Sequence, residues 1–171
     1  MLHRALPLMM ATALMVSGCG LQPLYGGGMR SPVTATLSSL DVAPIAGEAG
    51  WLVRGALRDR LSAAGETANP RYRIDVILDD AITGFGVRAD DSVTRERRTL
   101  RARWQLIDTT NGATLIDDTA GSDAGIDVVG SEYATIAAEQ TALERLAQTL
   151  ADQIVVRIAQ FARNDGASSR P

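Results

Sequence analysis

Arginine recurs at alternate positions in the segment 93–107, whose composition is typical of a long β-strand. Side chains two residues apart on a strand point to the same face and lie about 6.5–7 Å apart. Guanidinium groups form paired hydrogen bonds with phosphates and carboxylates. This face of the segment therefore predicts a surface that binds an anionic ligand, formed by Arg95, Arg97, Arg101 and Arg103.

The same arginines could instead be neutralised within the protein. If the preceding strand forms a hairpin with this one, Asp75 and Asp79 lie opposite or diagonal to three of the arginines. Arg95 and Arg97 have the fewest acidic neighbours, and Arg88 lies near them on the intervening loop. Both interpretations stay open on the sequence alone, and these three arginines are the better candidates for a ligand contact.

An apolar pair, Phe85 and Val87, alternates with glycines in the loop predicted after residue 83. An exposed phenylalanine on a flexible loop suits docking into the wall of a partner protein. The alternative is that Phe85 folds back over the edge of the core. The pair is therefore a candidate partner contact.

Adjacent aspartates occur at positions 79–80, 90–91 and 117–118. Carboxylates of this kind bind hard cations such as Ca²⁺. Adjacent strand residues, however, point to opposite faces of a sheet, and loop aspartates are commonly solvated. We therefore expect no metal site and no cofactor.

The first nineteen residues have the pattern of a bacterial lipoprotein signal. Arg4 precedes an apolar run of about a dozen residues, which is too short to span a bilayer as a stable helix. The tetrad Val16-Ser17-Gly18-Cys19 resembles a lipobox, in which the cysteine thiol receives diacylglycerol. We expect cleavage before Cys19 and acylation of its thiol. The alternative is an ordinary signal peptide that ends beside a chance cysteine.

Cys19 and His3 are the only cysteine and histidine in the sequence. Cleavage after residue 18 would leave a mature chain without histidine or free thiol, which excludes Cys/His metal sites and His-based triads. We therefore expect a lipid-anchored protein that is not an enzyme. The net charge of -3 argues against a general nucleic-acid binder. All 17 basic residues are arginine, which fits phosphate recognition and a GC-rich coding bias equally well.

Hydrophobic periodicity predicts four strands and two helices in the order β-α-β-β-β-α. Period-two alternation and turn residues predict the strands, over 33–42, 71–83, 93–107 and 113–120. Apolar residues at spacings of three and four predict the helices, over 47–64 and 132–163. An Asn-Gly pair at 111–112 predicts a tight turn between the last two strands.

Each of these elements has a single apolar face. The first helix carries an apolar stripe that starts at Trp51, and Gly55 within it predicts close packing against the sheet. On strand 93–107, Leu100 and Trp104 face opposite to the arginines. The expected fold class is α+β: a two-layer α/β sandwich with a four-stranded mixed sheet covered on one face by two helices. The other face of the sheet is left for a ligand or partner.

The predicted domain organisation has four parts. A lipoprotein signal peptide over 1–18 precedes an acylated N-terminal tether over 19–32, which is rich in glycine and proline. A single α/β domain over 33–163 follows, and residues 164–171 are expected to form a disordered tail.

The predicted mature start, Cys19-Gly20-Leu21-Gln22-Pro23-Leu24-Tyr25-Gly26, resembles the start of the LptE family of lipopolysaccharide-assembly lipoproteins, in its alphaproteobacterial form. The resemblance implies an outer-membrane lipoprotein that faces the periplasm and has no enzymatic activity. It also implies two partners: the β-barrel translocon LptD, which such proteins plug and help to assemble, and lipopolysaccharide in transit to the outer leaflet. Gly20 after the cysteine resembles the usual case for export to the outer membrane.

A second interpretation stays open at this point. An auxiliary lipoprotein of a phospholipid-transporting ABC system would also combine a lipobox with a small α/β domain. The Pro-Leu-Tyr-Gly opening favours the lipopolysaccharide-assembly family.

Overall fold

A computed structural model describes residues 31–65, 68–87 and 93–168. The chain folds in the order α2 (Pro32–Ser38), β1 (Leu40–Val42), α3 (Gly47–Ser62), β2 (Tyr72–Val87), β3 (Val93–Asp108), β4 (Thr114–Asp127) and α4 (Glu132–Ser168). The predicted cleavage site, Cys19 and the N-terminal motif lie outside the described residues, as does Arg88.

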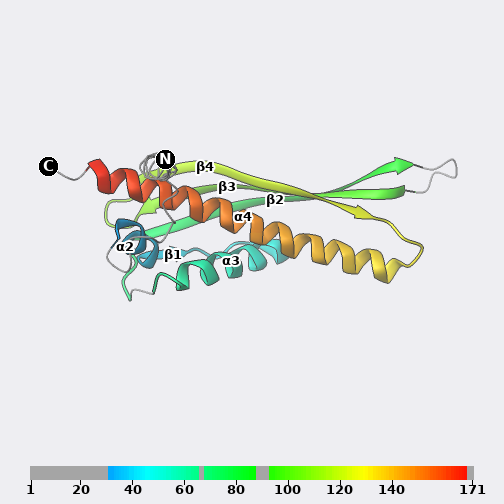
Figure 1. The fold of residues 1–171 in the computed structure, drawn as a ribbon, viewed down its shortest axis with the longest axis horizontal. Coiled ribbons are helices and arrows are strands. Elements are labelled where there is room, and N and C mark those ends of the chain that lie inside the picture. Colours follow the sequence, from blue (N-terminus) through cyan, green and yellow to red (C-terminus); the bar gives the residue numbers. More distant parts are fainter. Residues whose placement is uncertain (1–30, 66–67, 88–92, 169–171) are drawn as a thin grey trace, which may run out of the picture.

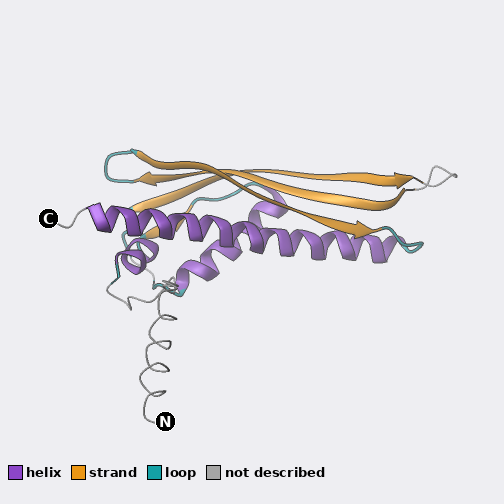
Figure 2. Cartoon of the chain, turned by 45° about the horizontal axis from the view of Figure 1, so that its top comes forward, coloured by secondary structure: helices purple, strands orange, loops and turns teal. Residues whose placement is uncertain are grey.

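The four strands form one mixed sheet in the order β1-β2-β3-β4. β1 runs parallel to β2, and the β2–β3 and β3–β4 pairs are antiparallel. The helices lie on one side of this sheet, and the other side has no cover within the described ranges (Figure 1, Figure 2). The predicted α+β class and one-sided layering are confirmed.

The first predicted strand is wrong over most of its length. Residues 33–38 belong to helix α2, and only Leu40–Val42 form a strand. The Ser31 hydroxyl accepts a hydrogen bond from the Thr34 N–H at 3.1 Å, and Pro32 occupies the first turn. A capping serine followed by proline starts a helix despite β-branched residues that favour a strand.

The hairpin of β2 and β3 is longer than predicted. The segment Gly84–Val87, predicted as a loop, continues β2 and pairs with β3 up to Val87 opposite Val93. Gly86 has a φ of +77°, and its carbonyl accepts a hydrogen bond from the Thr94 hydroxyl at 2.6 Å. Glycine is therefore needed at an irregular position within the strand pairing, not in a free loop.

β4 also extends past its predicted end near Ala120, to Asp127. Ile116 is buried and Leu115 is half-buried, which settles the register that two adjacent apolar residues left open. The predicted turn at 111–112 is confirmed, with Gly112 at a φ of +72°. At the other end of the chain, α4 continues past Arg163 to Ser168, so part of the expected tail is helical.

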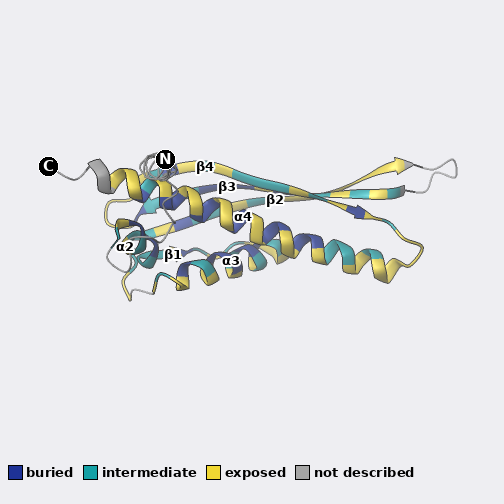
Figure 3. Ribbon diagram, viewed as in Figure 1, coloured by how far each residue is buried: buried dark blue, intermediate teal, exposed yellow. Residues whose placement is uncertain are grey.

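The core lies between the sheet and the two long helices (Figure 3). Leu100, Ala102, Trp104 and Leu106 of β3 are all buried, as their alternation predicts. From α4, the core receives a continuous stripe of buried residues: Leu143, Leu146, Leu150, Ile154 and Ile158. No residue between Glu132 and Thr141 of α4 is buried, so the core is confined to one half of the molecule.

Two expectations for α3 are wrong. Trp51 is 74% exposed and lies outside the apolar stripe. A Cβ at Gly55 would meet no atom within 4 Å, so this glycine does not mark a close approach to the sheet. The close approach is at Gly50, where a Cβ would lie 2.6 Å from the Ile45 carbonyl oxygen. No helix in the described ranges has a stretch apolar and long enough to cross a membrane.

Candidate functional site

The open face of the sheet carries the four predicted arginines of β3, which we call the arginine row: Arg95, Arg97, Arg101 and Arg103. All four are exposed, while the alternate residues from Leu100 to Leu106 of the same strand are buried in the core. The structure therefore brings the predicted residues together on one face, because a strand directs alternate side chains to opposite sides.

Three members of the arginine row are held by aspartates of β4. Arg95 Nε donates to Asp127 at 3.0 Å, Arg101 lies 3.8 Å from Asp123, and Arg103 donates twice to Asp117, at 3.1 and 2.9 Å. The β3–β4 register explains these contacts, since it places Asp127 opposite Arg95 and Asp117 opposite Gln105. These arginines are therefore neutralised within the protein. The carboxylates come from β4, which was predicted to end near Ala120.

The two aspartates expected to neutralise the row do not do so. Asp75 accepts two hydrogen bonds from Arg73 of its own strand, at 2.8 and 2.9 Å. Asp79 lies opposite Arg101 in the register but forms no ion pair with any residue in the described ranges. In the alternative of internal neutralisation, the aspartates named from β2 are therefore wrong. Arg95, expected to have few acidic neighbours, is paired with Asp127.

Arg97 is the member of the row without an ion pair among the described residues. Its guanidinium lies 5.4 Å from the centre of the Phe85 ring, a cation–π contact. Its neighbour on β4 is Gly125, where an added Cβ would meet no atom within 4 Å. Arg97 therefore combines an unpaired positive charge, an aromatic ring that is 39% exposed and open space on its far side.

Phe85 occupies a strand position, and this contact holds it on the open face rather than over the core edge. Val87 is the last residue of β2, and its side chain lies outside the described set.

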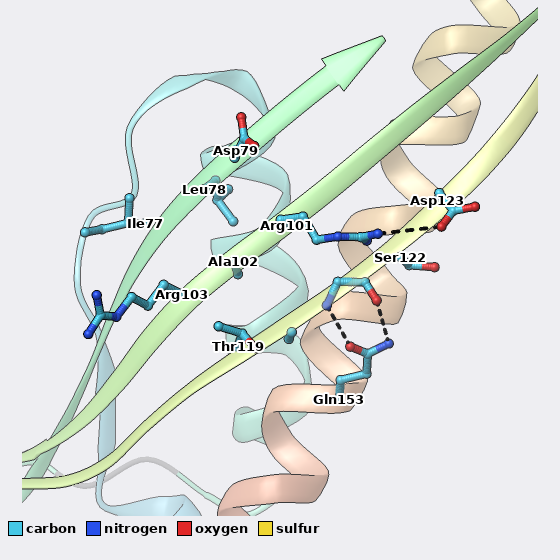
Figure 4. Close-up of a pocket in the computed structure, with 12 residues that line it drawn as sticks. Ile77, Leu78, Asp79, Arg101, Ala102, Arg103, Thr119, Ser122, Asp123 and Gln153 are labelled. Carbon is cyan, nitrogen blue, oxygen red and sulfur yellow. Dashed lines mark hydrogen bonds and ion pairs between the residues drawn. The ribbon is translucent and has the colours of Figure 1, made fainter. Parts of the chain in front are cut away.

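An open pocket of about 770 Å³ lies over the middle of this face (Figure 4). Its lining includes Ile77, which is 75% exposed, together with Arg101 and Arg103. A side chain at Gly121 would close part of it, because a Cβ there would lie 2.5 Å from Arg101 Cδ. Gly121 on β4 thus lets the Arg101 side chain extend across the strand, and the apolar Ile77 side chain lies beside Arg103 in the same pocket.

Hydrogen bonds from arginine lower the pKa of two adjacent aspartates of β4. Hydrogen bonds from Arg103 and Gln105 lower the pKa of Asp117 to about 2. On the helix side of β4, a hydrogen bond from Arg157 of α4 also lowers the pKa of Asp118. These aspartates therefore remain charged at any physiological pH. Within the described ranges, no three Asp, Glu, His or Cys side chains are grouped so as to hold a metal ion.

Two charged residues on the covered face, Arg98 and Glu96, were not predicted from the sequence. Arg98 donates to Asp80 at 2.9 and 2.6 Å and to the Glu139 carbonyl at 3.0 Å, so it links β2, β3 and α4. Glu96 has a buried Oε2 that accepts no hydrogen bond from any described residue. Burial and the neighbouring Glu139 raise its pKa. The sequence could have indicated them, because both are charged residues at positions that continue the apolar side of β3.

The fold and site define a small α+β domain with an open, arginine-bearing sheet face. Among solved structures, it is similar to a candidate lipoprotein of Caulobacter crescentus, with 29% identity, a TM-score of 0.62, and coverage of 77% of this chain and 96% of that one. The rare lipoprotein B of Shewanella oneidensis has the same fold at 14% identity, with a TM-score of 0.56 and coverage of 73% and 96%. Lipoprotein B of Nitrosomonas europaea matches at 14% identity and a TM-score of 0.55, with coverage of 74% and 88%.

The model of the LptE lipopolysaccharide-assembly family matches residues 37–158, and the chain belongs to that family. The match does not include the N-terminal motif that first suggested the resemblance, so the two observations are independent. No curated protein sequence is significantly similar to the chain.

Proposed function

We propose that this protein is an outer-membrane lipoprotein, acylated at Cys19 and facing the periplasm, that plugs an LptD-type β-barrel, assists its assembly and binds lipopolysaccharide during export. Membership of the lipopolysaccharide-assembly family supports the general role. The observation that carries the ligand proposal is the open sheet face, where cationic and apolar groups lie side by side. In this proposal the protein acts by binding and has no catalytic step.

Arg97 is the first contact that we assign to the glycolipid. A phosphate that approaches Arg95 or Arg103 must compete with an aspartate already in place. Arg97 carries no such competitor among the described residues, and the space over Gly125 admits a ligand beside it. Guanidinium groups bind phosphate through paired, charge-assisted hydrogen bonds. Arg97 therefore binds a phosphate at the lowest cost in broken ion pairs.

The pocket beside Ile77 supplies the second kind of contact. Lipopolysaccharide is an amphiphile, and its lipid A part joins phosphates to acyl chains. The exposed Ile77 side chain on β2, opposite Arg103, offers an apolar surface in the same pocket as Arg101 and Arg103. We assign Arg101 and Arg103 to anionic groups that displace or share their aspartates, and Ile77 to the apolar part. Arg88 and Arg95 complete the proposed glycolipid surface.

Contact with the barrel is assigned to the tip of the β2–β3 hairpin. Phe85 and Val87 lie near its end, where the described strands stop. A partly exposed aromatic ring at a projecting tip suits a position against a protein wall. Because Phe85 also contacts Arg97, barrel contact and ligand contact adjoin each other on the same hairpin.

Co-purification tests the function as a whole. An affinity-tagged full chain, isolated from its native membrane in mild detergent, should bring down a large β-barrel protein and lipopolysaccharide. An auxiliary lipoprotein of a phospholipid transporter would instead bring down an ABC permease, and that result would overturn the proposal. The match to the lipopolysaccharide-assembly family favours the first outcome.

The anchor is tested separately by Cys19→Ala. The variant should remain unprocessed, should take up no labelled palmitate and should be lost from the outer-membrane fraction. Ser17→Ala is a matched control, because alanine is also small and should leave cleavage and acylation intact. Normal palmitate labelling of the Cys19→Ala variant would contradict the assigned lipidation site.

A further inference from the structure

The two outer edges of the sheet differ in whether their main-chain N–H and C=O groups have hydrogen-bond partners. On β4, the Gln153 side chain of α4 accepts a hydrogen bond from the Gly121 N–H at 3.0 Å and donates to the Gly121 carbonyl at 3.2 Å (Figure 4). The side-chain amide thus takes the place of a neighbouring strand. The Thr119 N–H on the same edge donates to Asp118 at 2.8 Å, and Arg157 holds that carboxylate at 2.9 Å. Side chains therefore close this edge against strand addition.

The opposite edge is open along most of β2. β1 pairs only with Tyr72–Ile74, and no other strand of the described chain lies on that side of β2 (Figure 1). The Tyr72 N–H donates to the Ser39 carbonyl, and the Ile74 carbonyl accepts from Ala43, so even-numbered residues direct their main-chain groups away from β3. By continuation of this alternation, the N–H and C=O groups that face the open edge belong to Val76, Leu78, Asp80 and Ile82.

We propose that this open edge of β2, from Val76 to Ile82, binds an extended strand of a partner protein whose side chains alternate between aliphatic and basic. Unpaired main-chain groups in a row are a template for an added strand. The side chains beside the edge then select the partner. Ile82, which is directed to the helix side of the sheet, is 43% exposed and offers an apolar contact. Asp79, which is directed to the open face, carries a charge with no ion pair among the described residues. A strand with aliphatic residues on one face and basic residues on the other therefore matches both.

The charges of β2 argue against two other occupants. If a second copy of the chain paired β2 with β2, its Asp75, Asp79 and Asp80 would lie close to the same residues of the first copy, and like charges across strands are unfavourable. The anionic groups of a glycolipid would meet the unpaired Asp79 carboxylate at this edge, whereas the arginine row that binds them in the proposed function lies on the neighbouring strand. A basic, aliphatic strand matches both side chains.

The test uses a defined probe, a capped ten-residue peptide of alternating valine and lysine. Hydrogen exchange of backbone amides is measured by NMR on the full chain in detergent micelles, with and without excess peptide. Amides of Val76, Leu78, Asp80 and Ile82 should exchange at least tenfold more slowly with the peptide, while Gly121 should be unchanged. A peptide with every main-chain amide methylated keeps the charges but donates no main-chain hydrogen bond, and it should have no effect.

Matched charge reversals refine the test. Asp79→Lys should weaken peptide binding at least tenfold, whereas Asp59→Lys changes the net charge equally on the exposed side of α3 and should alter the Kd less than twofold. Equal protection by the methylated peptide, equal effects of the two variants, or no protection of β2 would overturn the proposal. Protection of β2 that rises with protein concentration in the absence of peptide would assign the edge to a second copy instead.

Discussion

Arg98 and Arg103 are both arginines of β3 that each donate two hydrogen bonds to an aspartate, but they lie on opposite faces of the sheet. The Arg98 side chain is 12% exposed and that of its partner Asp80 is 25% exposed. For Arg103 and Asp117, the values are 68% and 38%. The covered pair is enclosed and joins three elements, whereas the open pair is screened by water and can exchange its partner for a ligand.

Glu96 on the covered face and Asp117 on the open face have pKa values shifted in opposite directions. On the covered face, burial raises the pKa of Glu96, and the neighbouring Glu139 adds to the effect. On the open face, Arg103 and Gln105 lower the pKa of Asp117. One strand thus supports two electrostatic environments, because alternate residues face either the helices or the solvent.

A charge placed on the covered face should cause the largest loss of stability. Leu100→Asp should destabilise the domain by about 4 kcal/mol or more, because Leu100 is fully buried among apolar side chains and the new carboxylate has no partner. Thr99→Asp, one residue away on the open face, should change stability by less than about 1 kcal/mol. Denaturant unfolding followed by circular dichroism compares them, and similar midpoints would show that the faces are not distinct.

Removal of each arginine compares the two ion pairs directly. Arg98→Ala should cost about 2–3 kcal/mol, because it leaves the half-buried Asp80 and the Glu139 carbonyl without their donor. Arg103→Ala should cost much less, because the Arg103–Asp117 pair is exposed and screened by water. The free energy of unfolding from urea titration measures both. An equal loss would mean that the open pairs are structural as well.

Ligand binding should show the reverse order. Arg97→Ala should weaken lipopolysaccharide binding by about tenfold, or about 1.4 kcal/mol, with unfolding unchanged. Arg60→Ala on α3 is a control that removes a charge away from the open face. Binding by the wild type should also weaken as salt rises, because exposed charges are screened. Fluorescence titration across a salt series measures this, and unchanged binding by Arg97→Ala would assign the glycolipid site elsewhere.

Glu96→Gln tests whether the charged form of Glu96 destabilises the covered face. The raised pKa of Glu96 means that folding favours its protonated form, so this group contributes stability below pH 4.5 that is lost as pH rises through its folded pKa. The variant should therefore be more stable than the wild type at pH 7, with a smaller difference at pH 4. Thermal melts at both values measure it. A variant that is less stable at pH 7 would mean that charged Glu96 has a partner in solution.

Asp117→Asn gives the smallest expected effect. Because the pKa of Asp117 is lowered from 3.8 to about 2, its contribution to stability is present above pH 4 and is lost as pH falls toward 2. The variant should lose part of the acid sensitivity in that window and differ little from the wild type at pH 7. Unfolding midpoints between pH 2 and pH 5 measure this, and parallel curves would contradict the assignment.

The alternation along β3 was predictable because it is a local property. Leu100 and Trp104 fall on the same face as each other in any straight strand, and Arg97 and Arg101 fall on the other. The one-sided helical cover follows from it, since an apolar face needs burial. The phase of β3 and the layering of the fold therefore agree between sequence and structure.

The partners of the arginines were not predictable in the same way. Asp123 and Asp127 reach the row only because β4 continues through Gly121, Ala124 and Gly125, residues with little preference for a strand. Pairing with β3 overrides that preference. The register between two strands is a non-local property, and composition alone does not fix it. Helix α2 was not predicted for a different reason. Ser31 and Pro32 start a helix even though the residues that follow are also compatible with a strand.

The uneven length of the two long helices has a consequence for the dynamics of the domain. α3 covers only one half of the sheet, and the far half of the β2–β3–β4 layer rests on the first turns of α4 alone (Figure 1). Buried residues of α4 begin at Ala142, so these turns contribute little apolar packing. Segments with little buried apolar surface open by local unfolding at a small fraction of the global free energy. The far half of the described sheet can therefore open locally while the half built on Trp104 stays folded.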